Sequence, residues 1–203
     1  MPVPAIRAVA TGVQRRHPDL SHDDVVQLVG ILWDAPIHEH RMAAVELLDL
    51  HSSLLGRGDM PLLERLLRES RTWALADGLA ASVVGPVVER ESAAASVLDR
   101  WAVDDDFWIR RSALLALLIP LRGGTGDFER FCRYADAMLD DKEFFIRKAI
   151  GWVLRDTARK RPTMVYDWLL PRAGRASKVT LREAVKPLSD VQRSALANRT
   201  YVH

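Results

Sequence analysis

The sequence lacks the features of a secreted or membrane-embedded protein. It has one cysteine in 203 residues, Cys132, which excludes an internal disulfide framework and suits a reducing compartment. Its longest apolar run, Ala113 to Leu121, is too short to cross a bilayer and contains Pro120. The N-terminus shows no signal-peptide pattern. We therefore expect a cytoplasmic protein with no membrane partner.

Motifs for metals, nucleotides and nucleophilic catalysis are also scarce. No glycine-rich phosphate loop occurs. His38 and His40 are two residues apart, a spacing that points two imidazoles on a helix away from each other. Cys132 has no evident histidine partner, and the aspartates at 104–106 fit a helix cap better than a metal cluster. None of these groups is a strong candidate for chemistry.

Lysine is scarce as well, because only 5 of the 29 basic residues are lysines and the rest are arginines. Arginine binds phosphate through paired hydrogen bonds and stacks on bases, which favours a nucleic-acid partner, although a high-GC genome produces the same bias.

The net charge of +2 is unevenly distributed along the chain. Residues 142–203 carry 14 basic and 5 acidic side chains, whereas residues 1–141 carry 15 and 22. A polyanion would be attracted to the C-terminal third.

What the sequence does contain is helical periodicity with an internal repeat. The segments Phe107–Ala113 and Phe144–Ile150 share a pattern at an offset of 37 residues, and each follows aspartates that we expect to cap a helix. Asp140 and Glu143 resemble a capping box. Helices that repeat at nearly 40 residues, without alternating strand segments, predict an all-α solenoid.

The positions of proline and glycine divide this pattern into helices joined by short turns, as at Gly85-Pro86. No linker is long enough to separate domains, so we expect a single domain over residues 1–203. The expected helices lie near 3–16, 22–34, 37–55, 60–69, 72–84, 88–101, 106–120, 127–139, 143–160, 163–170, 178–186 and 189–196.

The helix expected at 143–160 has two dissimilar faces. One stripe has the spacing of an ordinary core face: Ile146, Ala149, Ile150 and Val153. The opposite stripe interleaves rings with cations: Phe145, Lys148, Trp152, Arg155 and Arg159. Rings beside positive charges suit a partner that offers both bases and phosphates. The alternative is that the rings pack on a neighbouring helix while the cations reach into solvent.

Trp73 and Asp77 are four residues apart, so they share one face of the helix expected at 72–84. Their neighbours are small and apolar, and a carboxylate in such surroundings is costly unless it has a partner or a use. It could stabilise a developing cation or orient a water molecule. Alternatively, Asp77 could form an ion pair with Arg71 or Arg111.

Five segments resemble, in the same order, the AlkD family of bacterial alkylpurine DNA glycosylases, and the resemblance spans almost the whole chain. The run at 142–155 follows the family signature most closely. Trp73 and Asp77 match its Trp-x-x-x-Asp catalytic pair. The remaining matches are Phe107–Arg111, Leu32–Pro36 and Leu181–Lys186.

The resemblance implies a superhelix of HEAT-like repeats that hydrolyses the N-glycosidic bond of cationic alkylated purines, such as N7-alkylguanine and N3-alkyladenine, in duplex DNA without base flipping. Asp77 would stabilise the oxocarbenium-like sugar, and Trp73 and Trp152 would line the cleft. The resemblance implies no metal or organic cofactor, and we expect a monomer without an obligate protein partner. The residues expected to hold DNA are Arg111, Lys148, Phe144, Phe145, Arg155 and Arg182.

The sequence departs from the family pattern in two places. Thr72-Trp73-Ala74 stands where members often carry Trp-Trp-Asp, so a second aromatic ring and a second carboxylate are missing. Residues 1–7 resemble a turn that the family places after a leading pair of helices, so we expect that pair to be absent. A non-catalytic HEAT-like module that recognises the shape of DNA or its damage is the alternative function, and a protein-binding solenoid is the third.

Overall fold

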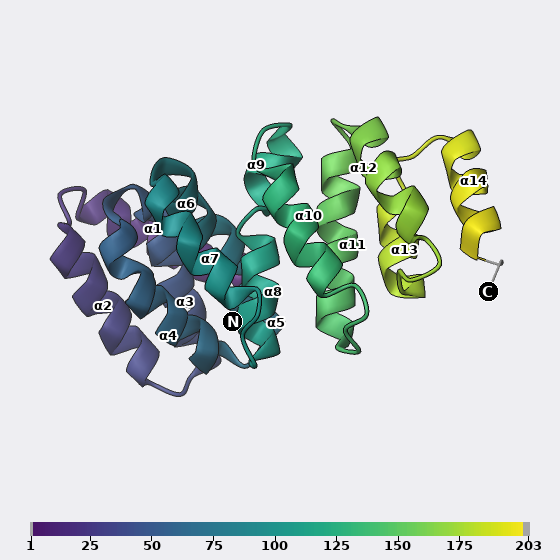
Figure 1. The fold of residues 1–203 in the computed structure, drawn as a ribbon. Helices are drawn as coiled ribbons and strands as arrows, with labels where there is room; N and C mark the ends of the chain where they lie inside the picture. Colours follow the sequence, from purple (N-terminus) through teal and green to yellow (C-terminus); the bar gives the residue numbers. More distant parts are fainter. Residues whose placement is uncertain (1, 201–203) are drawn as a thin grey trace. The chain divides into compact units, whose positions relative to one another are not determined.

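The computed structural model describes residues 2–200, in which every regular element is a helix and no strand occurs (Figure 1). The all-α class expected from the sequence is therefore confirmed. The chain divides into two compact units, Met1–Leu98 and Asp99–His203, with the boundary inside helix α7 (Ala95–Trp101). The single domain expected over residues 1–203 stays a prediction.

In the first unit, α3 is the central helix, because α1, α2 and α5 all pack against it. α5 also packs against α4. Leu48 and Leu63, from two of these helices, are completely buried. The α-helices that lie wholly in this unit are α1 (Val3–Arg16), α2 (His22–Asp34), α3 (His38–Leu50), α4 (Met60–Ser70), α5 (Trp73–Gly78) and α6 (Gly85–Arg90).

In the second unit, α11 is the central helix and contacts α8, α9, α12 and α13. Gly151 allows α13 to approach closely, because a Cβ atom at this position would lie 2.9 Å from the carbonyl oxygen of Thr180 and from Cβ of Glu183. The α-helices of this unit after α7 are α8 (Phe107–Leu115), α9 (Leu118–Gly123), α10 (Phe128–Ala137), α11 (Phe144–Ala158), α12 (Pro162–Leu169), α13 (Lys178–Ala184) and α14 (Asp190–Thr200).

The internal repeat has a structural basis at the start of α8 and of α11. Arg110 donates hydrogen bonds to the carbonyl oxygens of Asp104 and Asp105, at 2.7 and 2.9 Å. At the equivalent position in the next repeat, Arg147 donates to the carbonyl oxygen of Asp141 at 2.6 Å. In both repeats an arginine therefore ties the first turn of the helix to the acidic turn before it.

The expected caps are only partly correct. Asp106 caps α8 by accepting a hydrogen bond from the backbone N–H of Trp108 at 2.9 Å. The capping box expected from Asp140 and Glu143 is wrong, because Glu143 is itself the N-cap of α11 and makes no side-chain cap bond. Asp141 instead accepts from the backbone N–H of Glu143 at 2.8 Å, which fixes the turn before the helix.

Several helix boundaries also differ from the expectation, and two of these differences occur at proline. The helix expected at 106–120 is divided into α8 and α9, because the ring of Pro120 would clash with the carbonyl group of Ala116 in a continuous helix. The break expected at Gly85-Pro86 does not occur. A π-helical segment, η3 (Leu79–Val84), leads directly into α6, and the N–H of Gly85 bonds to the carbonyl oxygen of Ala80, five residues earlier.

Candidate functional site

Trp73 and Asp77 both lie in α5, so the expectation that they share one face of a helix is consistent with the structure. Thr72 caps the helix by accepting a hydrogen bond from the backbone N–H of Ala74 at 3.4 Å. Trp73 is the first residue of the helix, and 57% of its surface is exposed. Asp77 is half-buried and interacts with other groups of the protein. The structure thus presents an indole to solvent beside a partly desolvated carboxylate.

The turn before α5 has an unusual backbone. Arg71 ends α4 in the left-handed conformation, with φ 49° and ψ 17°. A side chain at such a position costs about 1–2 kcal/mol, since its Cβ atom crowds the following carbonyl oxygen. The side chain of Arg71 is exposed and makes no hydrogen bond or ion pair with any residue of the described chain. The pairing of Asp77 with Arg71, considered from the sequence, is therefore not formed.

The π-helical segment η3 begins two residues after Asp77 and includes Leu79, Ala80, Val83 and Val84, all completely buried. A π turn accommodates an extra residue, and such turns are frequent at functional sites. The apolar side chains anchor this widened turn in the core of the first unit. Asp77 therefore lies at the change from α-helical to π-helical geometry, which the sequence did not predict.

On α11, the expected core stripe is confirmed, because Ile146, Ala149, Ile150 and Val153 are each 0% exposed. On the opposite side of α11, some side chains are packed against other helices and others are exposed to solvent. Phe145 lies in an aromatic cluster, with ring centroids 5.1 Å from Trp108 and 6.4 Å from Phe107. Both partners belong to α8. Packing on a neighbouring helix, the alternative considered from the sequence, is thus what Phe145 does.

Phe144 and Lys148 occupy the exposed part of this surface. Phe144 is 49% exposed, and Nζ of Lys148 lies 5.8 Å from the centroid of its ring. The ring of Phe144 also meets Phe145 edge-on at 5.5 Å, so it rests on the aromatic cluster. A ring and a cation that are both open to solvent can contact a base and a phosphate respectively.

Arg111 differs from the exposed phosphate contact that the resemblance implies. It is only 2% exposed. Its guanidinium group donates to the carbonyl oxygen of Phe145 and lies 5.8 Å from the centroid of that ring. In this structure Arg111 therefore ties α8 to the beginning of α11, and its DNA-binding role stays a prediction.

Trp152 has a partner that the sequence analysis did not single out, the carboxylate of Asp156. Asp156 is 2% exposed and accepts hydrogen bonds from the indole of Trp152 at 3.1 Å, from Nε of Arg122 at 2.8 Å and from Nε of Arg155 at 3.1 Å. Burial alone would raise the pKa of Asp156, but the hydrogen bonds from Arg155 and Arg122 outweigh burial and lower this pKa below its usual value. The four-residue spacing of Trp152 and Asp156 was the available signal.

Arg155 continues this network to α13. Its guanidinium group pairs with the carboxylate of Glu183, which also accepts from Nζ of Lys186 at 2.8 Å. These two partners lower the pKa of Glu183, with the bond from Lys186 contributing most. The side chain of Arg155 is 25% exposed. Its charge is thus already paired within the protein.

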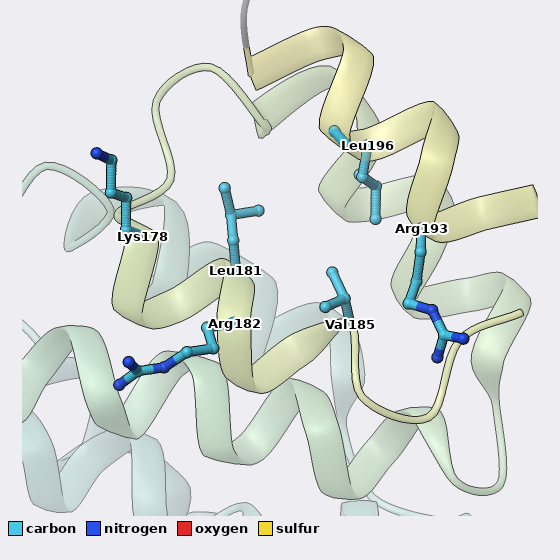
Figure 2. A pocket seen from close by; sticks show the side chains of 7 residues that line it. Lys178, Leu181, Arg182, Val185, Arg193 and Leu196 are labelled. Carbon is cyan, nitrogen blue, oxygen red and sulfur yellow. The ribbon is translucent and has the colours of Figure 1, made fainter. Parts of the chain in front are cut away.

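Arg182 lies beside a hollow of about 600 Å³ within the second unit, between α13 and α14 (Figure 2). Figure 2 shows that the charged ends of Lys178, Arg182 and Arg193 point in different directions, so they form no convergent anion site. The side chain of Arg182 is exposed and makes no hydrogen bond or ion pair within residues 2–200. The residues that line the hollow are Lys178, Leu181, Arg182, Val185, Arg193, Leu196 and Ala197.

A model of the family described as DNA alkylation repair enzyme matches residues 1–188. The chain belongs to this DNA alkylation repair family. The match agrees with the resemblance found in the sequence, and it identifies α5 and α11 as parts of a DNA repair protein.

Solved structures of similar proteins support the fold. A predicted DNA alkylation repair enzyme from Enterococcus faecalis is similar with a TM-score of 0.83 and 20% sequence identity, over 94% of this chain and 87% of that one. AlkD2 from Streptococcus mutans is similar with a TM-score of 0.70 and 17% identity, over 93% and 91%. The helical repeat fold expected for the chain is thereby confirmed. No protein with a curated description matches.

Residues 2–200 contain few groups that could support another kind of catalysis. Within residues 2–200, no cluster of three or more histidine, cysteine or acidic side chains could hold a metal ion. Burial raises the pKa of the Cys132 thiol to about 12, so it is protonated and unreactive at neutral pH. In the same part of the chain, no helix is both long and apolar enough to cross a membrane.

Proposed function

We propose that this chain is a DNA glycosylase that hydrolyses the N-glycosidic bond of cationic alkylated purines in duplex DNA, without flipping the base out of the helix. The observation that carries the proposal is the pair formed by an exposed Trp73 and a half-buried Asp77 on one face of α5. Membership of the DNA alkylation repair family supports it.

The chemistry suits a carboxylate that acts without a metal. Alkylation at N7 or N3 makes the purine a cation, so the base departs as a neutral leaving group. The bond between C1′ of the sugar and the purine nitrogen breaks, and its electron pair goes to the purine. The oxygen of a water molecule then bonds to C1′, and a water proton passes to a base or to solvent. Asp77 would stabilise the positive charge that develops on the sugar and orient this water.

We assign roles to the remaining residues according to how exposed their side chains are. Trp73 would contact the sugar–phosphate backbone beside the lesion, where its ring stabilises positive charge by about 1 kcal/mol. We assign phosphate contacts first to Lys148 and Arg182, because both are exposed. Phe144 and Trp152, both on α11, would contact bases or sugars. Arg111, Phe145 and Arg155 would act mainly by holding α11 in place, since each has a partner within the protein.

The test uses duplex DNA methylated at random, from which released bases are identified by mass spectrometry. We expect free 7-methylguanine or 3-methyladenine with the wild-type protein, and a rate about 100-fold lower with Asp77→Asn, because one focused electrostatic group is lost. Asp167→Asn removes an exposed carboxylate on α12 and serves as the matched control. Equal rates for Asp77→Asn and wild type would contradict the assignment of Asp77.

A second function is favoured by one specific observation, the exposed pairing of Phe144 with Lys148. A ring and a cation on this surface could bind DNA whether or not Asp77 takes part in catalysis. A non-catalytic protein that recognises the shape of DNA would bind with strong salt dependence, release no base, and bind equally well with Asp77→Asn. The base-release assay and a binding assay together separate the two functions.

A further inference from the structure

Arg71 is the only residue other than glycine with a positive φ among residues 2–200. It occupies the position after α4 where glycine or asparagine is usually found, because these residues adopt the left-handed conformation at little cost. A large side chain at this position is unfavourable for folding. A strained residue of this kind is expected where an interaction of its side chain offsets the cost of the backbone conformation.

Residues 2–200 do not supply such an interaction. Arg71 is exposed, and no residue of the described chain forms a hydrogen bond, an ion pair or a ring contact with it. Several other arginines of the first unit do have such partners. Arg7 pairs with Glu46 at 2.8 Å, and Arg41 donates to the carbonyl oxygen of Glu69 at 3.0 Å. Within residues 2–200 the guanidinium group of Arg71 therefore has no partner, and it can bind a group outside the protein.

The position of Arg71 indicates what kind of partner its guanidinium group binds. Thr72 follows it and caps α5, and Trp73 comes next with 57% of its surface exposed. A cation and a ring separated by one capping residue suit a phosphate and the sugar or base attached to it. We propose that Arg71 binds a backbone phosphate of duplex DNA next to the nucleotide that Trp73 and Asp77 contact. This inference rests on the function proposed above and adds a binding residue that neither the periodicity nor the family resemblance indicated.

A purely structural role for Arg71 makes the opposite prediction. A cation at the C-terminal end of α4 interacts favourably with the helix dipole, so in that case removal of the charge would lower stability and leave DNA binding unchanged. Glycine and asparagine at position 71 separate these roles, because both fit the left-handed backbone and both remove the charge. Arg71→Lys retains the charge on a residue that fits the backbone no better than arginine does.

The experiment measures binding of the full chain to an undamaged, fluorescently labelled duplex over a range of salt concentrations, together with thermal unfolding. For Arg71→Gly and Arg71→Asn we expect binding to be about fivefold to tenfold weaker at ~0.1 M salt, and the slope of log K against log salt to fall by about 1, as for the loss of one phosphate contact. Arg71→Lys should keep the wild-type slope. The Tm of Arg71→Gly should rise by roughly 2 °C, because the backbone strain is relieved.

Arg57→Gln is the matched control, because Arg57 is an exposed arginine near the other end of α4. Its affinity and salt slope should equal those of the wild type. Wild-type affinity and slope for Arg71→Gly and Arg71→Asn would overturn the proposal for Arg71, even if the wild-type protein releases methylated bases. The same two variants with a reduced slope in a protein that releases no base would support Arg71 as a DNA contact and overturn the glycosylase function. Absence of DNA binding by the wild-type protein would overturn both.

Discussion

Trp73 and Asp77 in α5 have the same spacing as Trp152 and Asp156 in α11, but the two pairs lie in different surroundings. The indole of Trp152 donates to Asp156, which is 2% exposed and also accepts from two arginines. Trp73 is 57% exposed and Asp77 is half-buried. Four-residue spacing places a ring and a carboxylate on one face of a helix, but the neighbouring helices decide whether the carboxylate is enclosed or accessible.

This difference is consistent with the different tasks that we propose for the two carboxylates. A buried carboxylate surrounded by donors is already stabilised, and a substrate could engage it only by displacing those donors. A half-buried carboxylate beside an exposed ring is accessible to a charge that develops nearby during a reaction. The comparison therefore supports Asp77 as the catalytic candidate and Asp156 as the residue that holds Trp152 and the arginines around it.

The largest expected effect that separates the pairs is on stability. Asp156→Ala should reduce the free energy of unfolding by about 3 kcal/mol, because it removes the acceptor shared by Trp152, Arg122 and Arg155 in a buried site. Asp77→Ala should reduce it by about 1 kcal/mol or less, since that side chain is half-buried. Urea unfolding followed by circular dichroism measures both values. Equal losses for the two variants would remove the distinction between the carboxylates.

The pH dependence of stability tests the charged network around Asp156. The pKa values of Asp156 and Glu183 are lowered in the folded protein, so near pH 4 and below the unfolded chain binds more protons at these groups. Their contribution to stability is therefore complete above the unfolded pKa values of about 4 and is lost as the pH falls through the folded values. The difference between wild type and Asp156→Ala in urea unfolding should shrink from pH 7 to pH 3. A constant difference over this range would contradict the role of the charged network.

The sequence predicted the helices well where the apolar period was regular. The bounds expected at 3–16 and 22–34 are those of α1 and α2, and the core stripe expected on the helix at 143–160 is completely buried. Periodicity reports which face of a helix is buried, and it succeeded for that reason. It could not predict the π-helical turn after Asp77, because the apolar period does not report the register of the backbone hydrogen bonds.

The candidate site was only partly predictable for a related reason. The sequence placed Trp73 with Asp77 and identified the two faces of α11. It could not show that Arg111 is buried against Phe145, or that Arg155 is paired with Glu183, because the partners lie 34 and 28 residues away on other helices. It also gave no sign that Arg71 adopts the left-handed conformation, since glycine is the usual signal for that backbone.

The smallest expected effect concerns the two indoles. Trp152→Phe removes the hydrogen bond to Asp156 at 3.1 Å and leaves one lone pair of a buried carboxylate without a donor, so it should reduce the free energy of unfolding by about 1 kcal/mol. Trp73→Phe should change it by less than about 0.5 kcal/mol, since Trp73 is 57% exposed. Thermal and urea unfolding of both variants measure the difference. If Trp73→Phe were the more destabilising change, the indole of Trp73 would belong to the structural framework, and the contrast between the two pairs would be lost.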